Sequence, residues 1–327
     1  MSYQTLFQSE FKPAWWLTNP HLQTLGAKYL RRKEQLNTIT EILELPDDDF
    51  IELAWTELPK TGNTRPIIVL LHGLAGSKDS HYAKGMLKAI KKQGWIGVLM
   101  HFRGCGKQQN RQASSYHSGD TRDITFLTNV LNHRYSQSPL ALIGFSLGGN
   151  VLTRYLAEQT SSPYQAAIAI CAPLHLASCS TRINSGFSKI YQQYLVDMLK
   201  ASTQEKIALK LIPQLCTNKL ARIKTIWGFD DYVTAPINGF NNAEHYYQQA
   251  SGRDVLANIT SPCLIIHASD DPFLSHQDII KVHNLPKNIR FEVSSNGGHV
   301  GFIAGNNPLK PQFWLEQRSI NFLENHL

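Results

Sequence analysis

The chain has 327 residues, of which 42% are hydrophobic and 17% are charged. A disordered chain would have more charge and fewer aromatic residues, so this composition predicts a folded protein with a sizeable core. The length fits one large α/β domain with an insertion, or two ordinary domains. The net charge is +7 at neutral pH. The densest basic run is only Arg31-Arg32-Lys33, and no nucleic-acid-binding motif accompanies it, so we expect no nucleic-acid partner.

The cysteines and the N-terminal residues indicate the cellular compartment. The five cysteines are odd in number and form no Cys-x-x-Cys motif, which argues against a disulfide framework or a structural zinc site. Reduced thiols in a cytoplasmic protein are the simplest interpretation. Residues 1–16 lack the basic and apolar regions of a signal peptide, and no apolar run is long enough to span a bilayer. The aromatic N-terminal segment and the positive charge leave weak peripheral membrane contact open. The sequence does not indicate an oligomeric state.

The first part of the chain contains a lead-in segment, a hairpin and a strand. Residues 1–38 are polar and aromatic. In residues 39–58, apolar residues alternate around Pro46-Asp47-Asp48-Asp49, which predicts a β-hairpin with a polar turn. Residues 66–71 (PIIVLL) are a continuous apolar run, typical of a strand buried on both faces of a parallel sheet.

Helix and strand patterns then alternate as far as residue 170. The predicted helices are residues 82–93, 120–135 and 147–158, and the predicted strands are residues 95–100, 140–143 and 166–170. Alternation of this kind is typical of a parallel, doubly wound sheet with helices on both faces. The predicted fold class is therefore α/β.

The alternation stops over residues 173–260, where the pattern is mostly helical. It resumes with strands at residues 262–267 and 289–293 and a closing amphipathic helix at residues 312–327. We therefore divide the chain into a lead-in (1–38), a core (39–172 and 261–327) and a helical insertion (173–260). Ligands of open α/β sheets bind at the carboxyl edge of the strands, so we expect the insertion to form a lid over that edge. Packing at the side of the sheet is the alternative.

Ser146 lies in the motif Gly144-Phe145-Ser146-Leu147-Gly148. Gly-x-Ser-x-Gly alone is weak evidence. Here a predicted strand runs directly into the motif and a predicted helix runs directly out of it, which is the setting of a nucleophile elbow. Glycines two residues to either side allow the chains to approach closely, and the helix N-terminus stabilises developing negative charge. We therefore predict that Ser146 is a nucleophile.

A serine nucleophile needs a base and a group that orients the base. In folds with a nucleophile elbow the order along the chain is Ser, then Asp or Glu, then His. His299 follows the last predicted strand and two glycines, and it is the predicted base. Asp271 is the predicted orienting acid, because it stands three residues after the small Ala268 that ends a strand. Asp270 remains its competitor.

Three other histidines lie in the same part of the chain. His267 ends a buried strand, and we expect it to be a core or edge residue with its hydrogen bonds satisfied. His276 and His283 are expected on the following helix, mostly in solvent. These positions leave His299 as the preferred base.

The reaction of a serine nucleophile builds negative charge on a carbonyl oxygen, which two backbone N–H groups normally bind. One N–H should come from Leu147, the residue after the nucleophile. The other should come from Leu74 in the loop His72-Gly73-Leu74-Ala75-Gly76, which follows a buried strand. A plain turn between strand and helix is the alternative for this loop.

Motifs beyond the triad are spread from residue 21 to about residue 318. They are HLQT (21–24), HFRGC (101–105), YHSG (116–119), GFSLGGN (144–150), FDD (229–231), DDPF (270–273) and GGHVGF (297–302). With them the chain resembles the AB hydrolase superfamily and, within it, the AB hydrolase 4 family, which includes bacterial YheT-like esterases. The resemblance implies an α/β-hydrolase fold with a helical lid and an esterase-like activity that uses Ser146, Asp271 and His299.

The predicted reaction is hydrolysis of a small-molecule carboxylic ester through an acyl-enzyme, with no metal or organic cofactor. Two alternatives stay open: an acyltransferase that passes the acyl group to an alcohol or thiol, and a non-catalytic binding protein on the same fold. Eukaryotic relatives of the family act on acyl esters and phospholipids, and some transfer acyl groups. Arg103 and Asp120 could bind substrate, although charged residues in such loops more often pair to fix loop geometry.

Overall fold

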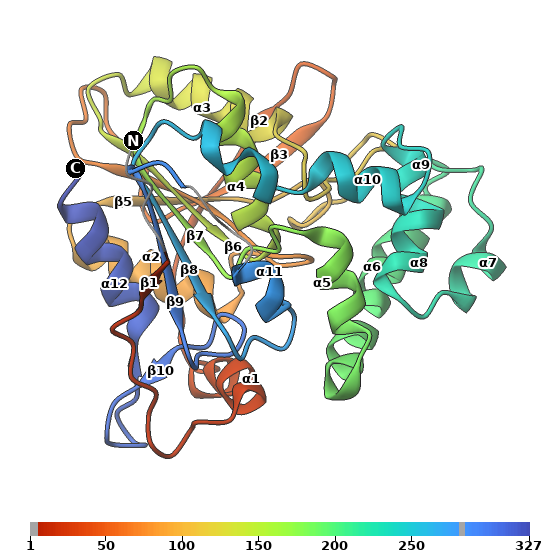
Figure 1. Ribbon diagram of the computed structural model, residues 1–327. Helices are drawn as coiled ribbons and strands as arrows, with labels where there is room; N and C mark the ends of the chain where they lie inside the picture. The colour runs from red at the N-terminus through yellow and green to blue at the C-terminus, as the bar shows by residue number, and fades with distance from the viewer. Residues whose placement is uncertain (1–5, 281–284) are drawn as a thin grey trace.

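The centre of the molecule is a sheet of nine strands in the order β1-β9-β8-β7-β6-β4-β5-β3-β2 (Figure 1). This is a computed structural model, and it describes residues 6–280 and 285–327. Neighbouring strands from β1 to β5 in this order are parallel, and β3 pairs antiparallel with both β5 and β2. The strands are β1 (Phe7–Gln8), β2 (Ile39–Glu44), β3 (Phe50–Trp55), β4 (Ile67–Leu71), β5 (Ile96–Met100), β6 (Leu140–Phe145), β7 (Tyr164–Ile170), β8 (Cys263–Ala268) and β9 (Ile289–Ser294).

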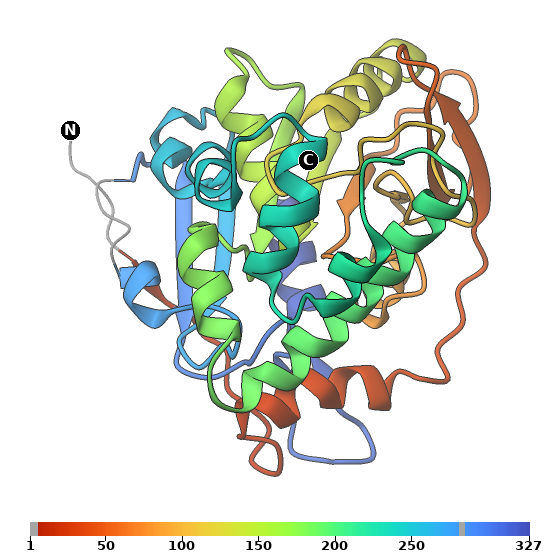
Figure 2. The same cartoon turned by 90° about the vertical axis from the view of Figure 1, so that its right-hand side faces the viewer.

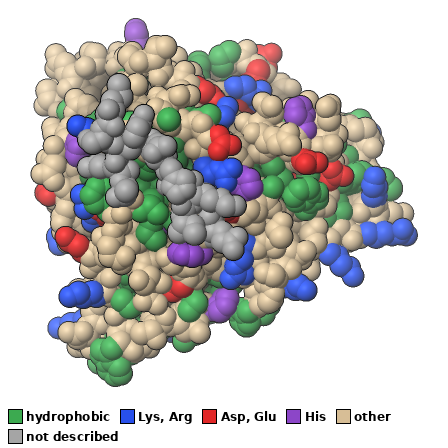
Figure 3. Space-filling view, in the orientation of Figure 1, with side chains coloured by type: hydrophobic (Ala, Val, Ile, Leu, Met, Phe, Trp, Pro, Cys, Tyr) green, Lys and Arg blue, Asp and Glu red, His purple; other side chains and the backbone are tan. Residues whose placement is uncertain are grey.

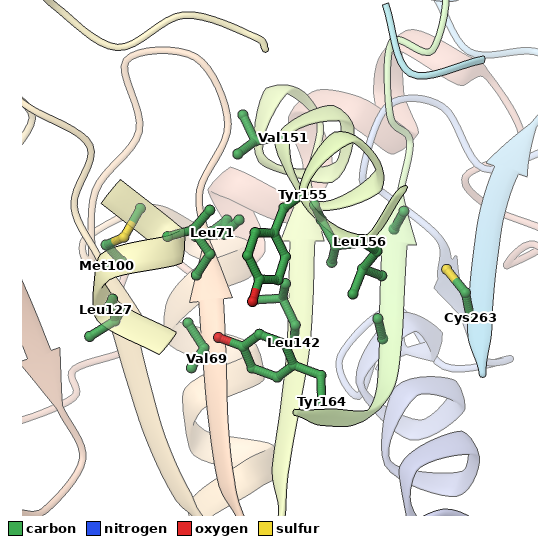
Figure 4. Close-up of a cluster of buried hydrophobic side chains, with 14 of the residues drawn as sticks. Val69, Leu71, Met100, Leu127, Leu142, Val151, Tyr155, Leu156, Tyr164 and Cys263 are labelled. Carbon is green, nitrogen blue, oxygen red and sulfur yellow. The ribbon is translucent and has the colours of Figure 1, made fainter. Parts of the chain in front are cut away.

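Helices cover both faces of this sheet. Helices α2 (His81–Lys92) and α12 (Trp314–Glu324) pack on one face, and α3 (Arg122–Arg134) and α4 (Leu147–Glu158) pack on the other. Alternate residues of each central strand point to opposite faces, so Val69 and Leu71 meet α3 and α4 while Ile68 and Leu70 meet α2 and α12. Figure 4 shows the α3–α4 side of this core. The prediction of an α/β, mostly parallel sheet is confirmed.

The individual elements agree with the sequence patterns. The predicted hairpin is the β2–β3 pair, with its turn at Pro46–Asp49. The predicted helix at residues 147–158 is α4, and the other predicted core strands and helices lie within a few residues of their predicted bounds. The closing helix, α12, begins at Trp314, two residues later than predicted. Gln312–Phe313 forms a short strand, β11, paired with β10 (Ile303–Ala304) before α12 begins.

The segment between β7 and β8 is helical and contains no strand. Its elements are α5 (Leu176–Ile183), η1 (Gly186–Ser188), α6 (Lys189–Ala208), α7 (Thr217–Arg222), α8 (Ile226–Phe229), η2 (Asp230–Thr234), α9 (Ala235–Ile237), α10 (Ala243–Ala250) and η3 (Arg253–Asn258). Most of them stand beside the sheet in Figure 1, and the green and teal helices lie in front of it in Figure 2. No helix among the described residues is long and apolar enough to cross a membrane.

The lead-in segment contains two elements that the sequence pattern does not predict. Strand β1 joins the sheet edge beside β9, and helix α1 (Pro20–Leu30) packs under the loop that contains His299. The Asn19 side chain accepts hydrogen bonds from the N–H groups of His21 and Leu22, and Pro20 stands at the first helical position. These are ordinary helix-start signals. A short helix followed by a polar stretch has too few apolar positions for its periodicity to stand out.

Candidate active site

Ser146 stands on a tight turn between β6 and α4. Its φ of 50° and ψ of −121° are unfavourable for a residue with a side chain. The turn is held by a 2.8 Å hydrogen bond from the Ser146 N–H to the Ile170 carbonyl. A Cβ atom at Gly144 would lie 2.3 Å from the Gly148 carbonyl oxygen, and one at Gly148 would lie 2.5 Å from the Leu71 carbonyl oxygen. Both positions therefore require glycine, and the turn presents Ser146 at the carboxyl edge of the sheet.

His299 lies between Ser146 and Asp271. Its Nε2 is 3.0 Å from Ser146 Oγ, and its Nδ1 is 2.8 Å from Asp271 Oδ2. Asp271 is 2% exposed and its second oxygen accepts a 2.7 Å hydrogen bond from the Phe273 N–H. The Phe273 ring stacks on the imidazole, with centroids 4.1 Å apart and planes 14° apart. Because Asp271 is an acceptor at Nδ1, the ring proton lies there and leaves Nε2 free to accept the serine proton.

Asp270, the competitor of Asp271, makes a different contact. Its Oδ1 accepts a 2.9 Å hydrogen bond from the backbone N–H of Gly298, next to His299. Burial raises the pKa of Asp270, and hydrogen bonds from the loop oppose that rise. The structure thus places Asp271 against the imidazole ring and Asp270 against the backbone of the histidine loop.

The loop after β4 lies against Ser146. A Cβ atom at Gly73 would be 3.3 Å from Ser146 Cβ. Tyrosine hydroxyls accept hydrogen bonds from the N–H groups of Gly73 and Ala75, at 2.9 and 2.8 Å. The N–H group between them, that of Leu74, has no hydrogen-bond partner among the described residues, and the same holds for Leu147. Both predicted oxyanion donors therefore have free N–H groups within the described residues.

His72 holds this loop from beneath. It is completely buried, and its Nε2 accepts a 3.1 Å hydrogen bond from the Phe102 N–H. The ring proton is therefore on Nδ1, which donates to the Gly73 carbonyl at 2.7 Å. Burial lowers the pKa of His72 to about 3, so the ring stays neutral and keeps this tautomer at physiological pH. Sequence reasoning placed His72 in the loop but did not predict this positioning contact.

Helix α1 supports the His299 loop, a role that sequence reasoning missed. Thr24 Oγ1 accepts a 2.9 Å hydrogen bond from the His299 N–H and donates one of 2.8 Å to the Pro20 carbonyl. The Gln23 side chain accepts from the Ile303 N–H at 2.6 Å and donates to the Ile303 carbonyl at 2.9 Å. Gln23 is completely buried. The HLQT motif marked these residues as important, but a motif does not identify the residue that they contact. Here that residue, His299, lies about 275 residues away from Thr24 along the chain.

Cys171 is a second residue that sequence reasoning missed. It is buried, has a φ of 49°, and its sulfur accepts a hydrogen bond from the Val300 N–H at 3.4 Å. Within the described residues, Cys171, Asp271 and His299 are the one group whose ligand atoms lie close enough together to hold a metal. Burial raises the pKa of the Cys171 thiol well above its usual value, whereas a metal needs the thiolate. Metal binding would also take the Asp271 and His299 atoms out of the hydrogen bonds described above.

Two motif residues considered as substrate contacts form structural ion pairs instead. Arg103 is buried, donates to both oxygens of Asp123 at 2.7 and 2.9 Å, and contacts Asp47 at 2.6 Å. Asp120 pairs with Arg122 at 2.8 Å. Arg103 and Asp120 therefore pair with neighbouring charges and fix loop geometry, which was the second of the two interpretations given for them.

The other histidines differ partly from expectation. His267 is buried at the end of β8, as expected, but neither ring nitrogen has a hydrogen-bond partner among the described residues. The expectation that its hydrogen bonds are satisfied is wrong. The ring packs on Phe291 instead, with centroids 5.0 Å apart, and burial lowers its pKa to about 4, which keeps it neutral. His276 is exposed at the start of α11 (His276–Ile280), as predicted, and His283 lies outside the described residues.

The fold agrees with comparisons to known proteins. A sequence model of the alpha/beta hydrolase fold matches residues 66–305, and the chain belongs to that family. Within it, the chain groups with the AB hydrolase 4 family, as its motifs indicated. The chain is 42% identical to the YheT protein of Escherichia coli (strain K12) over 98% of this chain and 94% of YheT. It is 29% identical to a monoacylglycerol lipase of Saccharomyces cerevisiae over 74% of this chain and 56% of the lipase. The structure of the Pyrococcus furiosus esterase Pf2001 has the same fold, with a TM-score of 0.57, 17% identity, and coverage of 89% of this chain and 93% of the esterase.

Proposed function

We propose that the protein is a serine hydrolase that cleaves a small-molecule carboxylic ester through an acyl-enzyme. The observation that carries the proposal is the chain of hydrogen-bond distances from Ser146 Oγ through His299 to Asp271, 3.0 and 2.8 Å long. These distances match those of a nucleophile, its base and the group that orients the base. Relatives that are named as an esterase and a lipase support an ester as the substrate.

In the proposed first step, His299 Nε2 takes the proton of Ser146 as the serine oxygen attacks the ester carbonyl. Asp271 stabilises the resulting imidazolium. The free N–H groups of Leu74 and Leu147 bind the oxyanion, and the start of α4 adds its positive dipole end. His299 then donates its proton to the leaving alcohol. In the second step the same imidazole takes a proton from water, which attacks the acyl-enzyme carbonyl. The imidazolium then returns the proton to Ser146 Oγ as the bond to the acyl group breaks and the acid leaves.

We also propose that the helical insertion is a lid over this site. Tyr191 of α6 packs on Phe273, with ring centroids 5.1 Å apart, and Phe273 stacks on His299. Ser188 Oγ donates a 2.7 Å hydrogen bond to the Pro272 carbonyl, one residue after Asp271. These contacts support an insertion that lies over the acid and base rather than at the side of the sheet.

The five cysteines are free thiols. Burial raises the pKa of Cys105 and Cys263 to about 12, so both are protonated and unreactive at neutral pH. Free thiols of this kind support the expected location in a reducing compartment such as the cytoplasm.

A fluorophosphonate probe, which labels activated serines, tests the proposal directly. We expect labelling of the wild type and of Ser161→Ala, a matched change on an exposed turn, and no labelling of Ser146→Ala. Hydrolysis of a graded series of p-nitrophenyl esters should fall by about a million-fold in Ser146→Ala, with its circular dichroism unchanged. A folded Ser146→Ala protein that keeps most of its hydrolysis would refute the assignment. A folded wild type that neither reacts with the probe nor cleaves any ester would favour the alternative that this chain is a non-catalytic binding protein.

A further inference from the structure

Three segments far apart in the sequence meet at one end of the molecule. They are α1 with the loop before it, the end of α5 with η1 and the first half of α6, and the loop between β10 and β11. This end is lowest in both Figure 1 and Figure 2. Trp15 Nε1 donates to the Asn306 carbonyl at 3.2 Å, and His21 Nδ1 lies 3.2 Å from the Tyr191 hydroxyl. We call this surface, formed by residues 11–33, 182–196 and 305–311, the basal face.

The basal face holds the whole net positive charge of the chain. Its residues include eight Lys or Arg and no Asp or Glu, which leaves 24 basic and 25 acidic residues for the rest of the chain. Arg31 is buried in an ion pair with Glu316. The other seven form no ion pair with any residue that the structure describes: Lys12, Lys28, Arg32, Lys33, Arg182, Lys189 and Lys310. Their charges are available to an external anion.

The same face exposes large apolar and aromatic side chains. Within the described residues, eight of the thirteen exposed large hydrophobic side chains belong to it, with exposures from 41% to 91%: Trp15, Leu22, Tyr29, Leu30, Phe187, Ile190, Tyr194 and Leu309. Figure 3 shows hydrophobic side chains at the lower tip of the molecule, over the two loops. Charged and aromatic side chains of the face are in contact at one point, where the Lys28 ammonium lies 5.4 Å from the centre of the Tyr194 ring. Scattered exposed apolar residues are normal in any protein, but a cluster of this kind marks an interaction site.

We propose that the basal face docks on the surface of an anionic phospholipid layer. Lys and Arg at such a surface are attracted by the negative headgroups. Tryptophan, tyrosine and aliphatic side chains between them gain free energy by entering the boundary between headgroups and acyl chains. A nucleic acid would neutralise the charges but leave aliphatic side chains such as Ile190 and Leu309 in water. A second copy of the face would bring two positive surfaces together.

The position of the basal face relates it to the triad. Tyr191 belongs to the face and contacts both His21 and Phe273, and Phe273 stacks on His299. Along this row of contacts, the Phe273 side chain alone separates the basal face from the proposed base. Docking there would bring lipid esters to the side of the molecule where His299 lies. This last step rests on the proposed function, whereas docking itself does not.

Sedimentation with vesicles tests the docking. We expect the wild type to bind vesicles of phosphatidylcholine and phosphatidylglycerol, and not vesicles of phosphatidylcholine alone, with binding that weakens as salt is added. Each Lys at the surface should contribute about five-fold to the binding constant, so Lys28→Ser combined with Lys189→Ser should lower it by about thirty-fold. The matched control is Lys91→Ser with Lys92→Ser, at the far end of α2, which should bind as the wild type does.

Apolar contact is tested by Ile190→Ser, with Ile39→Ser on the edge strand β2 as its control, since both side chains are about half exposed. Only Ile190→Ser should weaken binding. Ser146→Ala should bind vesicles normally, so a failure of docking and a failure of the proposed chemistry are separable. Equal binding to both kinds of vesicle, equal losses in the control variants, or binding to DNA in preference to the anionic vesicles would overturn the proposal.

Discussion

Thr24→Val tests whether helix α1 positions the proposed catalytic histidine. Valine has nearly the shape of threonine, but it removes the oxygen that accepts the His299 N–H at 2.9 Å and donates to the Pro20 carbonyl. The His299 loop packs tightly on α1 at this point, since a Cβ at Gly298 would lie 2.4 Å from the Pro20 oxygen and 2.7 Å from Thr24 Oγ1. The His299 N–H would therefore lose its partner while remaining largely buried.

The size of the effect follows from the cost of an unpaired buried donor. Leaving a buried N–H without an acceptor costs about 1–3 kcal/mol. If the loop relieves this cost by moving, the population with His299 Nε2 within reach of Ser146 Oγ falls by the corresponding factor. Turnover should then fall by about five- to 150-fold. KM should change little, because Thr24 contacts the backbone of His299 and not its ring.

The assay is steady-state hydrolysis of a short-chain p-nitrophenyl ester, with kcat and KM determined separately. Thr24→Ser keeps the hydroxyl and should retain kcat within a few-fold of the wild type. Thr125→Val is the matched control, because its hydroxyl donates to the Thr121 carbonyl within α3, away from the site. The reasoning is refuted if Thr24→Val keeps the wild-type kcat, or if Thr24→Ser loses as much as Thr24→Val.

Four further substitutions have expected outcomes. Asp271→Asn should lower kcat by about ten-thousand-fold, because the amide favours the wrong histidine tautomer, whereas Asp270→Asn should cost only a few-fold, since its oxygen can still accept the Gly298 N–H; kcat of the two variants, measured side by side, decides between them. Burial raises the pKa of Asp230 to about 6 from 3.8, so the folded state binds its proton more tightly and the resulting stability is present below pH 4 and lost as pH rises through 6. Urea unfolding at pH 4 and pH 7 should therefore show the wild type losing about 3 kcal/mol relative to Asp230→Asn over that interval. Gly148→Ala should fail to fold or melt far below the wild type, because its Cβ would meet the Leu71 carbonyl oxygen at 2.5 Å; a normal melting temperature would contradict the close approach.

The core elements were predictable because their signals are local. The strands β4 and β5 are completely buried, so they read as continuous apolar runs, and α3 shows apolar residues on one face at helical spacing. The elbow at Ser146 was predictable for the same reason. A strand, a turn with two glycines and a helix follow one another within about twenty residues, and sterics at Gly144 and Gly148 permit few other residues.

The partners of the site were not predictable, because each depends on a contact between distant parts of the chain. Gln23 is a polar residue of a type that is mostly exposed in proteins, yet it is completely buried. Its amide satisfies both the N–H and the carbonyl of Ile303, in the manner of a neighbouring strand. Cys171 looks like an ordinary residue at the end of a strand, and only the fold places its sulfur beside Asp271 and His299. For His267 the prediction failed in the other direction. A polar residue in a core is expected to have hydrogen-bond partners, and His267 has none among the described residues.

Helix α1 has two sides with different tasks, and its sequence reflects both. Gln23, Thr24 and Ala27 recur at spacings of one, three and four and face the His299 loop, where Gln23 and Ala27 are buried. Leu22 and Tyr29 are seven residues apart, lie on the opposite side and are more than half exposed. Because both sets of residues belong to one helix of eleven residues, its backbone fixes their positions relative to each other. The exposed side chains of the basal face and the hydroxyl that holds the His299 N–H therefore come from a single element, which the sequence pattern does not predict.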